Sequence, residues 1–317
     1  MRRRHLILGG LSAFLTGCGR SRERVIGVIP KATSHLFFVS VHAGVQKASA
    51  DFHLSVLWNG PLDETDYTRQ IEIVDAMVAR QVDGLAISAT DERALVAPLE
   101  RALRAGIPVT VFDSGVNIAN YVSFIATGNY QAGCTAARML AALIGGKGEV
   151  AMVMQKPGGT STVLREQGFE DTIAKGYPGI RIAARQFGMA DPARSRAAAE
   201  NILTGHPDLA GLFASSEASS IGAIHAIRSR NLSGKIKLIT FDSSEDHIEG
   251  LRDGTVDVML VQDPFRIGYE AVKSLAEKLR GLTPAKRLDL PARAIVRSDL
   301  DKPEVRALLF PEWQKER

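Results

Sequence analysis

The feature that most constrains the fold of this chain is a regular alternation of short apolar runs with amphipathic segments from Val25 onward. The apolar runs have the length of strands, whereas the segments between them repeat apolar residues every three or four positions, as one face of a helix does. Strands that alternate with helices predict a parallel sheet covered by helices on both faces. The expected strands are 25–29, 54–58, 84–87, 109–112, 122–126, 149–154, 180–186, 211–214, 237–241 and 257–261.

Residues 1–17 have a different composition, in which three arginines precede a short apolar run. The run is about ten residues long and a bilayer takes roughly 20, so it predicts a secretory signal peptide. It closes on Leu15-Thr-Gly-Cys18, which resembles the bacterial lipobox, and the resemblance implies that Cys18 becomes the lipidated first residue. The alternative is a buried cysteine after a hydrophobic start. Residues 18–24 are expected to form a flexible tether.

Without residues 1–17 the chain is nearly neutral, because Lys+Arg falls from 39 to 36 (39 − 3) while Asp+Glu stays at 35. No basic patch or helix-turn-helix pattern accompanies this balance, which argues against a nucleic-acid partner. Cys18 and Cys134 are the only cysteines, so no disulfide framework is expected, and Cys134 is predicted to be a small core residue. The 293 residues after the tether (317 − 24) favour two domains over one.

Internal sequence similarity supports two lobes. Residues 84–91 (GLAISATD) resemble 211–217 (GLFASSE), and residues 111–114 (VFDS) resemble 240–243 (TFDS). The two offsets, 127 and 129 residues, are nearly equal and suggest a duplicated α/β unit.

Polar residues follow most of the expected strands, at the positions where open α/β sheets bind ligands. For any single serine or threonine, the cap of the following helix is the favoured explanation. Asp113 and Asp242 occupy equivalent places in the two halves, so we expect them to bind a ligand. The polar strand ends include Thr33-Ser34-His35, Ser88, Asp113-Ser114, Thr127, Gln155, Ser215-Ser216-Glu217, Asp242-Ser243 and Gln262-Asp263.

Two features indicate a ligand rich in hydroxyl groups. Phe37 and Phe38 are adjacent at the start of a predicted helix, so only one ring can face the core and the other is free to face a cleft. An exposed ring suits the C–H face of a sugar, while carboxylates and an arginine supply charge-assisted hydrogen bonds to hydroxyls. Arg165 is the expected arginine; the alternative for it is a solvated surface charge.

Several stretches resemble the type I periplasmic sugar-binding proteins related to ribose-binding protein, over residues 24 to about 296. The resemblance is carried by FFVS at 37–40, GVQK at 44–47, the two Phe-Asp turns, REQGF at 165–169 and VQDP at 261–264. It implies two Rossmann-like α/β lobes with parallel sheets joined by a three-segment hinge. The ligand contacts that it implies are His35, Phe37, Phe38, Ser88, Asp113, Thr127, Arg165, Ser216, Asp242 and Gln262.

The sequence departs from that family pattern at several implied contacts. His35, Ser88 and Ser216 stand where ribose binders usually carry asparagine, and Ser114 stands where they carry arginine. An aromatic residue expected from the second lobe is absent near Met189-Ala190. A pentose, hexose, polyol or related small ligand therefore stays open.

The sequence shows no obvious active site, because the phosphate-binding, dinucleotide-binding and nucleophile-elbow motifs are missing from it. The histidines show no metal-ligand spacing, so we expect no metal or cofactor. His35 with Asp113 as base and orienting group leaves an isomerase or glycosidase as a minor alternative. LacI-type repressors share the fold that the resemblance implies, but the N-terminus here reads as a leader and not as a DNA-binding domain.

The expected first lobe comprises residues 25–126 and 263–291, and the second comprises 127–262 and 292–300, followed by a tail at 301–317. Closure of two lobes around a ligand follows from the resemblance. It also implies an ABC permease with its ATPase as partner, or alternatively a chemoreceptor or sensor kinase. The expected location is the cell envelope, in the periplasm or at the outer face of the cytoplasmic membrane, through a lipid on Cys18.

Overall fold

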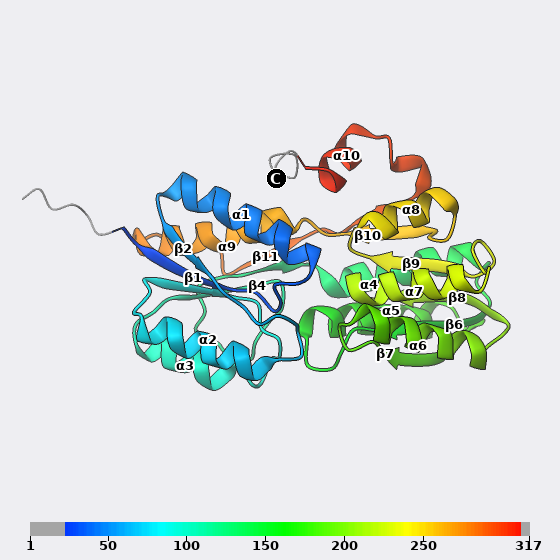
Figure 1. Ribbon diagram of the computed structural model, residues 1–317, viewed down its shortest axis with the longest axis horizontal. Helices are drawn as coiled ribbons and strands as arrows, with labels where there is room; N and C mark the ends of the chain where they lie inside the picture. Colours follow the sequence, from blue (N-terminus) through cyan, green and yellow to red (C-terminus); the bar gives the residue numbers. More distant parts are fainter. Residues whose placement is uncertain (1–22, 312–317) are drawn as a thin grey trace, which may run out of the picture.

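The structure is a computed structural model that describes residues 23–311. The predicted signal peptide, the lipidation site Cys18 and the last six residues lie outside the described part. The chain forms two lobes side by side, each built on a six-stranded sheet with helices on both faces (Figure 1). This is the α/β architecture that the alternating pattern predicts.

The sheet of the first lobe is parallel throughout and has the order β11-β5-β4-β3-β1-β2. Helices α1 and α9 cover one face, and α2 and α3 cover the other. The strands are β1 (Val25–Ile29), β2 (Ser55–Trp58), β3 (Gly84–Ile87), β4 (Val109–Phe112), β5 (Phe124–Thr127) and β11 (Arg287–Leu290). The helices are α1 (Leu36–Phe52), α2 (Tyr67–Ala79), α3 (Val96–Arg104) and α9 (Pro264–Leu279).

The sheet of the second lobe has the order β12-β10-β9-β8-β6-β7. Its edge strand β12 runs antiparallel to β10, so this sheet is mixed and not parallel throughout as expected. The strands are β6 (Gly148–Met154), β7 (Ile180–Phe187), β8 (Leu209–Ala214), β9 (Lys237–Phe241), β10 (Val258–Val261) and β12 (Arg293–Ile295). The helices are α4 (Asn129–Leu143), α5 (Thr160–Gly176), α6 (Pro192–Gly205), α7 (Glu217–Ser229), α8 (Glu245–Asp253) and α10 (Pro303–Leu309).

All of the expected strands are present, with bounds that differ from the prediction by two residues at most. Strand β11 was not predicted, because its Arg-Leu-Asp-Leu sequence buries one side chain fully and exposes two. The segment expected as a tail contains α10, whose Val305 and Leu309 pack into the core of the second lobe.

The chain passes between the lobes three times within the described residues: after β5, after β10 and after β11. Two hydrogen bonds tie these crossings together. The Thr127 hydroxyl donates to Gln262 Oε1 at 2.5 Å, and the Gly128 N–H donates to the carbonyl of Leu290 at 2.9 Å. The crossings therefore form one compact hinge.

Both lobes contain a pair of helices that cross at glycines. A Cβ at Gly44 on α1 or at Gly268 on α9 would come within 1.9 and 2.1 Å of a carbonyl oxygen of the partner helix. Gly133 on α4 and Gly168 on α5 face the same obstruction, at 1.9 and 2.1 Å. The first lobe thus uses the same packing device as the second, at the pair of helices next to the cleft.

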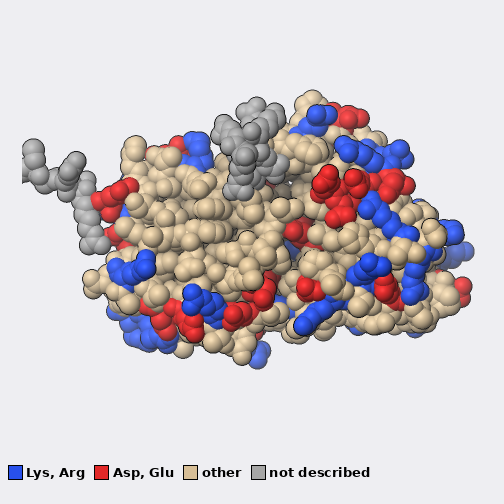
Figure 2. All heavy atoms as spheres, viewed as in Figure 1, with Lys and Arg blue, Asp and Glu red and all other residues tan. Residues whose placement is uncertain are grey.

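The face drawn in Figure 2 and the helices of residues 23–311 bear on whether the protein has a charged binding face or a membrane span. Basic and acidic side chains are interspersed over both lobes on the face that Figure 2 shows. Among residues 23–311, no helix has both the length and the apolar character needed to cross a bilayer. Cys134 is buried in α4, as predicted for a core residue.

Candidate functional site

A small cavity lies between the lobes, where the carboxyl ends of the two sheets face each other. Its volume is about 30 Å³, which is room for about two water molecules. Its wall comes from both lobes and comprises Lys31, His35, Phe37, Phe38, Glu64, Asp113, Gln155, Ser161, Thr162, Arg165, Ser216, Glu217, Ala218, Asp242 and Gln262. Eight of the ten predicted contacts are on this wall; Ser88 and Thr127 are not.

Asp113 and Asp242 hold equivalent positions, directly after β4 and β9. Both have left-handed backbone conformations, with φ of 55° and 71°, and both are almost fully buried. A residue with a Cβ adopts this conformation at a cost, which the surrounding structure must offset. The turn ends each strand abruptly and leaves the carboxylate on the cavity wall, once in each lobe.

Asp113 is surrounded by polar partners of its own lobe. The Ser88 hydroxyl donates to Asp113 Oδ2 at 2.7 Å, and Lys31 Nζ lies 3.3 Å from the same oxygen. Ser88 is fully buried and lies behind Asp113. It orients the carboxylate from outside the cavity wall, and its predicted contact with a ligand stays a prediction.

Asp242 has neutral partners. The amide of Gln262 donates to Oδ1 at 2.6 Å, and the backbone N–H of Glu217 donates to Oδ2 at 3.0 Å. Burial raises the pKa of Asp242 and outweighs the opposing effect of the positive charge on Arg165. Gln262 also accepts from Thr127 at the hinge, so Thr127 supports the site from behind.

Ser216 is the N-cap of α7 and forms a reciprocal capping box with Ser219. Its hydroxyl also donates to Gln155 Oε1. The helix-cap explanation is therefore correct for this serine, even though it lines the cavity.

Arg165 is 2% exposed, so it is not a solvated surface charge. Its Nε donates to Asn129 Oδ1 at 2.7 Å and its Nη1 donates to the carbonyl of Ser215 at 2.9 Å. The guanidinium carbon lies 3.7 Å from the centroid of the Phe241 ring. These contacts, all within the second lobe, fix the direction in which the arginine meets the cavity.

The two adjacent phenylalanines divide as predicted. Phe38 is 2% exposed and belongs to the core of the first lobe, whereas Phe37 is half-buried and contributes to the cavity wall. The rings meet edge to face, with centroids 5.0 Å apart. Packing against Phe38 thus holds the Phe37 ring at the cleft.

Seven residues of the cavity wall were missing from the predicted contacts: Lys31, Glu64, Gln155, Ser161, Thr162, Glu217 and Ala218. Lys31 Nζ lies 3.5 Å from Glu64 and donates to the Ser161 hydroxyl of the second lobe at 3.3 Å. Burial opposes the charge on Glu64, but Lys31 and His35 together lower its pKa. A usable signal existed for Lys31, which follows the first strand after a single proline, whereas Glu64 lies in an ordinary polar loop.

His35 is paired with Glu64, since its Nδ1 lies 3.4 Å from Glu64 Oε1. Burial lowers the pKa of His35, but the hydrogen bond and charge of Glu64 outweigh it, and the pKa is raised. The enzymatic alternative required His35 to pair with Asp113, and Asp113 is instead paired with Lys31. Within residues 23–311, no three His, Cys, Asp or Glu side chains are grouped to hold a metal ion.

Hydrogen bonds join the lobes directly across the cleft. Besides Lys31 to Ser161, the Gln155 amide donates to Glu64 Oε2 at 3.2 Å and Lys156 Nζ donates to the carbonyl of Thr90 at 2.6 Å. The structure therefore shows the two lobes in direct contact next to the cavity.

Comparison with known proteins places these features in a family. A family model for the periplasmic binding protein domain matches residues 26–283. The ribose import binding protein of Bacillus subtilis is 28% identical over 87% of this chain and 88% of its own length. The D-ribose/D-allose-binding protein of Pseudomonas aeruginosa is 29% identical over 83% of this chain and 85% of its own length.

Solved structures show the same architecture. A carbohydrate transporter solute binding protein from Agrobacterium radiobacter, in complex with D-arabinose, is 31% identical with a TM-score of 0.88, covering 91% of this chain and 99% of its own. An ABC transporter solute binding protein from Agrobacterium vitis, bound with α-D-tagatopyranose, is 31% identical with a TM-score of 0.87, covering 90% of this chain and 99% of its own. With its two lobes, triple crossing and interlobe cavity, this chain belongs to the periplasmic binding protein family.

Proposed function

We propose that this protein captures a small sugar or polyol between its lobes and delivers it to an ABC importer at the cell envelope, without chemical change of the ligand. The relatives at similar length are named as binding proteins, several of them for ribose or allose. Solved structures of similar fold carry D-arabinose, tagatose and D-fucose.

The observation that carries the proposal is the pair of aspartates on opposite walls of one cavity. Asp113 and Asp242 present carboxylate oxygens from the two lobes, Arg165 presents a fixed guanidinium, and Phe37 presents a ring. Hydroxyl groups donate to carboxylates and accept from a guanidinium, and a ring covers the apolar face of a sugar. A ligand that satisfies both aspartates must touch both lobes.

The charges of the wall favour an uncharged ligand. Lys31 is already placed between Glu64 and Asp113, and His35 is paired with Glu64. A carboxylate or phosphate on the ligand would have to displace one of these pairs, or lie beside Arg165 on a wall that already carries the carboxylates of Glu64, Asp113, Glu217 and Asp242, and an uncompensated buried charge is costly.

The size of the cavity limits how a ligand can enter. A space of about 30 Å³ is too small for a sugar ring, so the lobes must separate before a ligand enters. The bonds from Lys31 to Ser161 and from Gln155 to Glu64 cross the space between the lobes. In the proposed complex, ligand hydroxyls take the place of these bonds, and the lobes close on the ligand in proportion to its greater affinity for the closed form.

Calorimetric titration with a panel of pentoses, hexoses and polyols tests the proposal. Once a ligand is found, Asp113→Ala and Asp242→Ala should each weaken binding about 10- to 150-fold, since a hydrogen bond to a charged group contributes about 1.5–3 kcal/mol. Asp66→Ala is the matched control, because Asp66 caps α2 outside the cavity. It should cost stability and leave affinity unchanged, and unchanged affinity in both cleft variants would reject the two-lobe site.

We also propose that a lipid on Cys18 anchors the protein, as the lipobox-like sequence suggests; this residue is outside the described part of the structure. Cys18→Ala protein should leave the membrane fraction or stay unprocessed. A variant that remains processed and membrane-bound like the wild type would contradict the anchor. One acyl chain gives marginal attachment, so the proposal includes more than one.

Import and sensing separate in an uptake experiment. Cells that lack the protein should lose high-affinity uptake of the labelled sugar, and the wild-type gene should restore it. Uptake that is unaffected by the loss would favour the alternative role as ligand sensor for a chemoreceptor or sensor kinase.

A further inference from the structure

Helix α1 carries Phe37 in its first turn, and its own sequence does not cap it. The N-cap residue His35 makes no side-chain cap hydrogen bond, and the first turn contains no acidic residue. The first N–H groups of a helix have no partner within the helix and need one from elsewhere. For Leu36 and Phe37, that partner comes from the other lobe.

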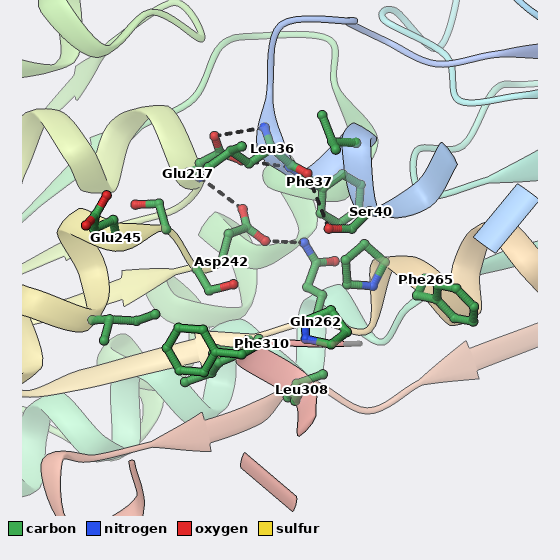
Figure 3. A pocket seen from close by; sticks show the side chains of 18 of the residues that line it. Leu36, Phe37, Ser40, Glu217, Asp242, Glu245, Gln262, Phe265, Leu308 and Phe310 are labelled. Carbon is green, nitrogen blue, oxygen red and sulfur yellow. Dashed lines mark hydrogen bonds between the residues drawn. The ribbon is translucent and has the colours of Figure 1, made fainter. Parts of the chain in front are cut away.

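The partner is the carboxylate of Glu217, at the start of α7. Its Oε1 accepts the N–H of Leu36 at 3.2 Å, and its Oε2 accepts the N–H of Phe37 at 3.0 Å. Figure 3 shows Glu217 reaching across to Leu36 and Phe37, with Asp242 below it in the view and Gln262 bonded to Asp242. Glu217 is 8% exposed, so the contact is almost completely shielded from solvent.

Helix α7 does not need this carboxylate for itself. Its amino end is capped by Ser216 with Ser219, and the backbone N–H of Glu217 is satisfied by Asp242. The Glu217 side chain is therefore free to serve a helix of the first lobe. Negative charge at the amino end of a helix is favourable, because the exposed N–H groups and the helix dipole point toward it.

We propose that Glu217 is a positioning residue that caps α1 from the opposite lobe and thereby couples closure of the lobes to the placement of Phe37. The two hydrogen bonds form only when the lobes meet, and they hold the backbone of the residue whose ring lines the cavity. When the lobes separate, α1 loses this cap. The inference deepens the proposed function, but the capping itself can be measured without any sugar.

Burial of the carboxylate opposes this contribution. It raises the pKa of Glu217, Asp242 adds to the rise, and His35 and the two N–H groups act in the other direction. The expected effect on ligand affinity is therefore that of a single helix cap, about tenfold.

The first measurement is NMR-detected hydrogen exchange of the Leu36 and Phe37 amides in the protein without ligand. Glu217→Ala should make both amides exchange at least tenfold faster, while amides in the middle of α1 keep their protection. Glu217→Gln keeps one carbonyl acceptor and should give an intermediate result, which also covers the case in which Glu217→Ala folds poorly. Unchanged exchange of both amides in both variants would overturn the proposal.

The second measurement is the radius of gyration in solution together with the dissociation rate of D-arabinose, or of another sugar found in the binding panel. Glu217→Ala should shift the unliganded protein toward an open form and raise the dissociation rate about tenfold, with little change in the association rate. The matched control is Asp191→Ala, which removes the cap of α6 within the second lobe. It should lower stability without changing exchange at α1, radius or dissociation rate.

The outcomes separate the two proposals. Faster exchange at Leu36 and Phe37 in a protein that binds no sugar would reject the proposed function and keep the cross-lobe cap. Sugar binding with equal dissociation rates and equal radius in the wild type and Glu217→Ala would reject the coupling and keep the proposed function.

Discussion

The two lobes share one plan but stabilise their cleft aspartates in different ways. Asp113 of the first lobe lies 3.3 Å from the ammonium of Lys31, whereas Asp242 of the second lobe is held by the amide of Gln262 and the N–H of Glu217. A buried carboxylate beside a cation is neutralised within its own lobe, while one that accepts only from neutral groups keeps its charge for a later partner. A bound ligand should therefore stabilise the negative charge of Asp242 more than that of Asp113.

The helix packing, by contrast, is the same in the two lobes. Gly44 with Gly268 and Gly133 with Gly168 occupy matching places, and in each pair a Cβ would collide with backbone of the partner helix. The matching glycines and the equivalent left-handed aspartates support duplication of an ancestral α/β unit more directly than the short similar segments of sequence do. The lobes differ in the partners of their cleft aspartates and are alike in the packing of these helix pairs.

The largest expected effect is a loss of stability at the glycines where the paired helices cross, and it tests whether the two lobes pack alike. Gly44→Ala and Gly133→Ala should each lower the free energy of unfolding by about 3 kcal/mol, because neither helix pair can move apart cheaply. Urea unfolding measures the loss. Gly176→Ala is the control: it ends α5 with no atom near the new Cβ, and should be neutral or slightly stabilising. A harmless change at Gly44 or Gly133 would break the proposed equivalence.

The next effect concerns two buried groups of the second lobe whose pKa values are shifted in opposite directions. Burial raises the pKa of Glu166 to about 7, and burial lowers the pKa of His247 to about 4. The raised carboxyl contributes stability below about pH 4.5 that is lost as the pH rises through about 7. The neutral histidine contributes stability above about pH 6.5 that is lost as the pH falls through about 4. Between pH 4.5 and 6.5 the two contributions offset each other.

Single variants should uncover each contribution. Relative to the wild type, Glu166→Gln should become more stable as the pH rises from 4.5 to 6.5, and His247→Gln should become less stable, each by about 2–3 kcal/mol. Urea unfolding at the two pH values measures both slopes. Equal slopes in the two variants and the wild type would show that neither group titrates in this range.

A smaller effect separates the two aspartates. Asp113→Asn leaves Lys31 with Glu64 as its remaining carboxylate and should cost about 2 kcal/mol of stability. Asp242→Asn should cost about 1 kcal/mol, since asparagine tolerates the left-handed backbone, but its single oxygen can accept from the N–H of Glu217 or from the Gln262 amide and not from both. Thermal melting of both variants gives the comparison. Equal losses would mean that Lys31 does not distinguish the two lobes.

The smallest effect uses Cys134 as a reporter of the second lobe. In protein with Cys18 replaced by serine, Cys134 should react slowly with a thiol reagent, because it is 7% exposed within α4. Gly133→Ala should speed the reaction by loosening α4 against α5, and Gly44→Ala in the other lobe should not. Rapid labelling of the otherwise unchanged protein would contradict the structural role of this cysteine.

The sequence predicts the parts of the site that follow from strand ends. Asp113, Asp242 and Gln262 each come directly after a buried strand, and the adjacent Phe37 and Phe38 divide between cleft and core as two neighbours on a helix must. Ser88 also follows a strand, and its hydrogen bond to Asp113 could not be predicted from the sequence; its contact with a ligand stays a prediction.

Charged residues that act across the cleft are much harder to predict. Glu64 looks like an ordinary solvated acid in the sequence, and only the folding of the first lobe brings it to Lys31 and His35. Glu217 follows a predicted strand, but its contact with the start of α1 forms only when the lobes approach. Strand β11 escapes prediction for a related reason, since its pairing with β5 depends on a residue separation of more than 150 positions along the chain.

The triple crossing has a consequence for the order in which the protein matures. The core of the first lobe includes Ile267, Val272 and Leu275 of α9, as well as Leu290 of β11. A chain that emerges from a secretion channel with its N-terminus first cannot complete this core until about residue 290 has been exported. The strands from β6 to β10 of the second lobe are contiguous in the sequence and emerge before residue 290, and β12 and α10 complete that lobe afterwards. The lobe that is synthesised first is therefore finished late, which keeps the leading part of the chain without its full core during export.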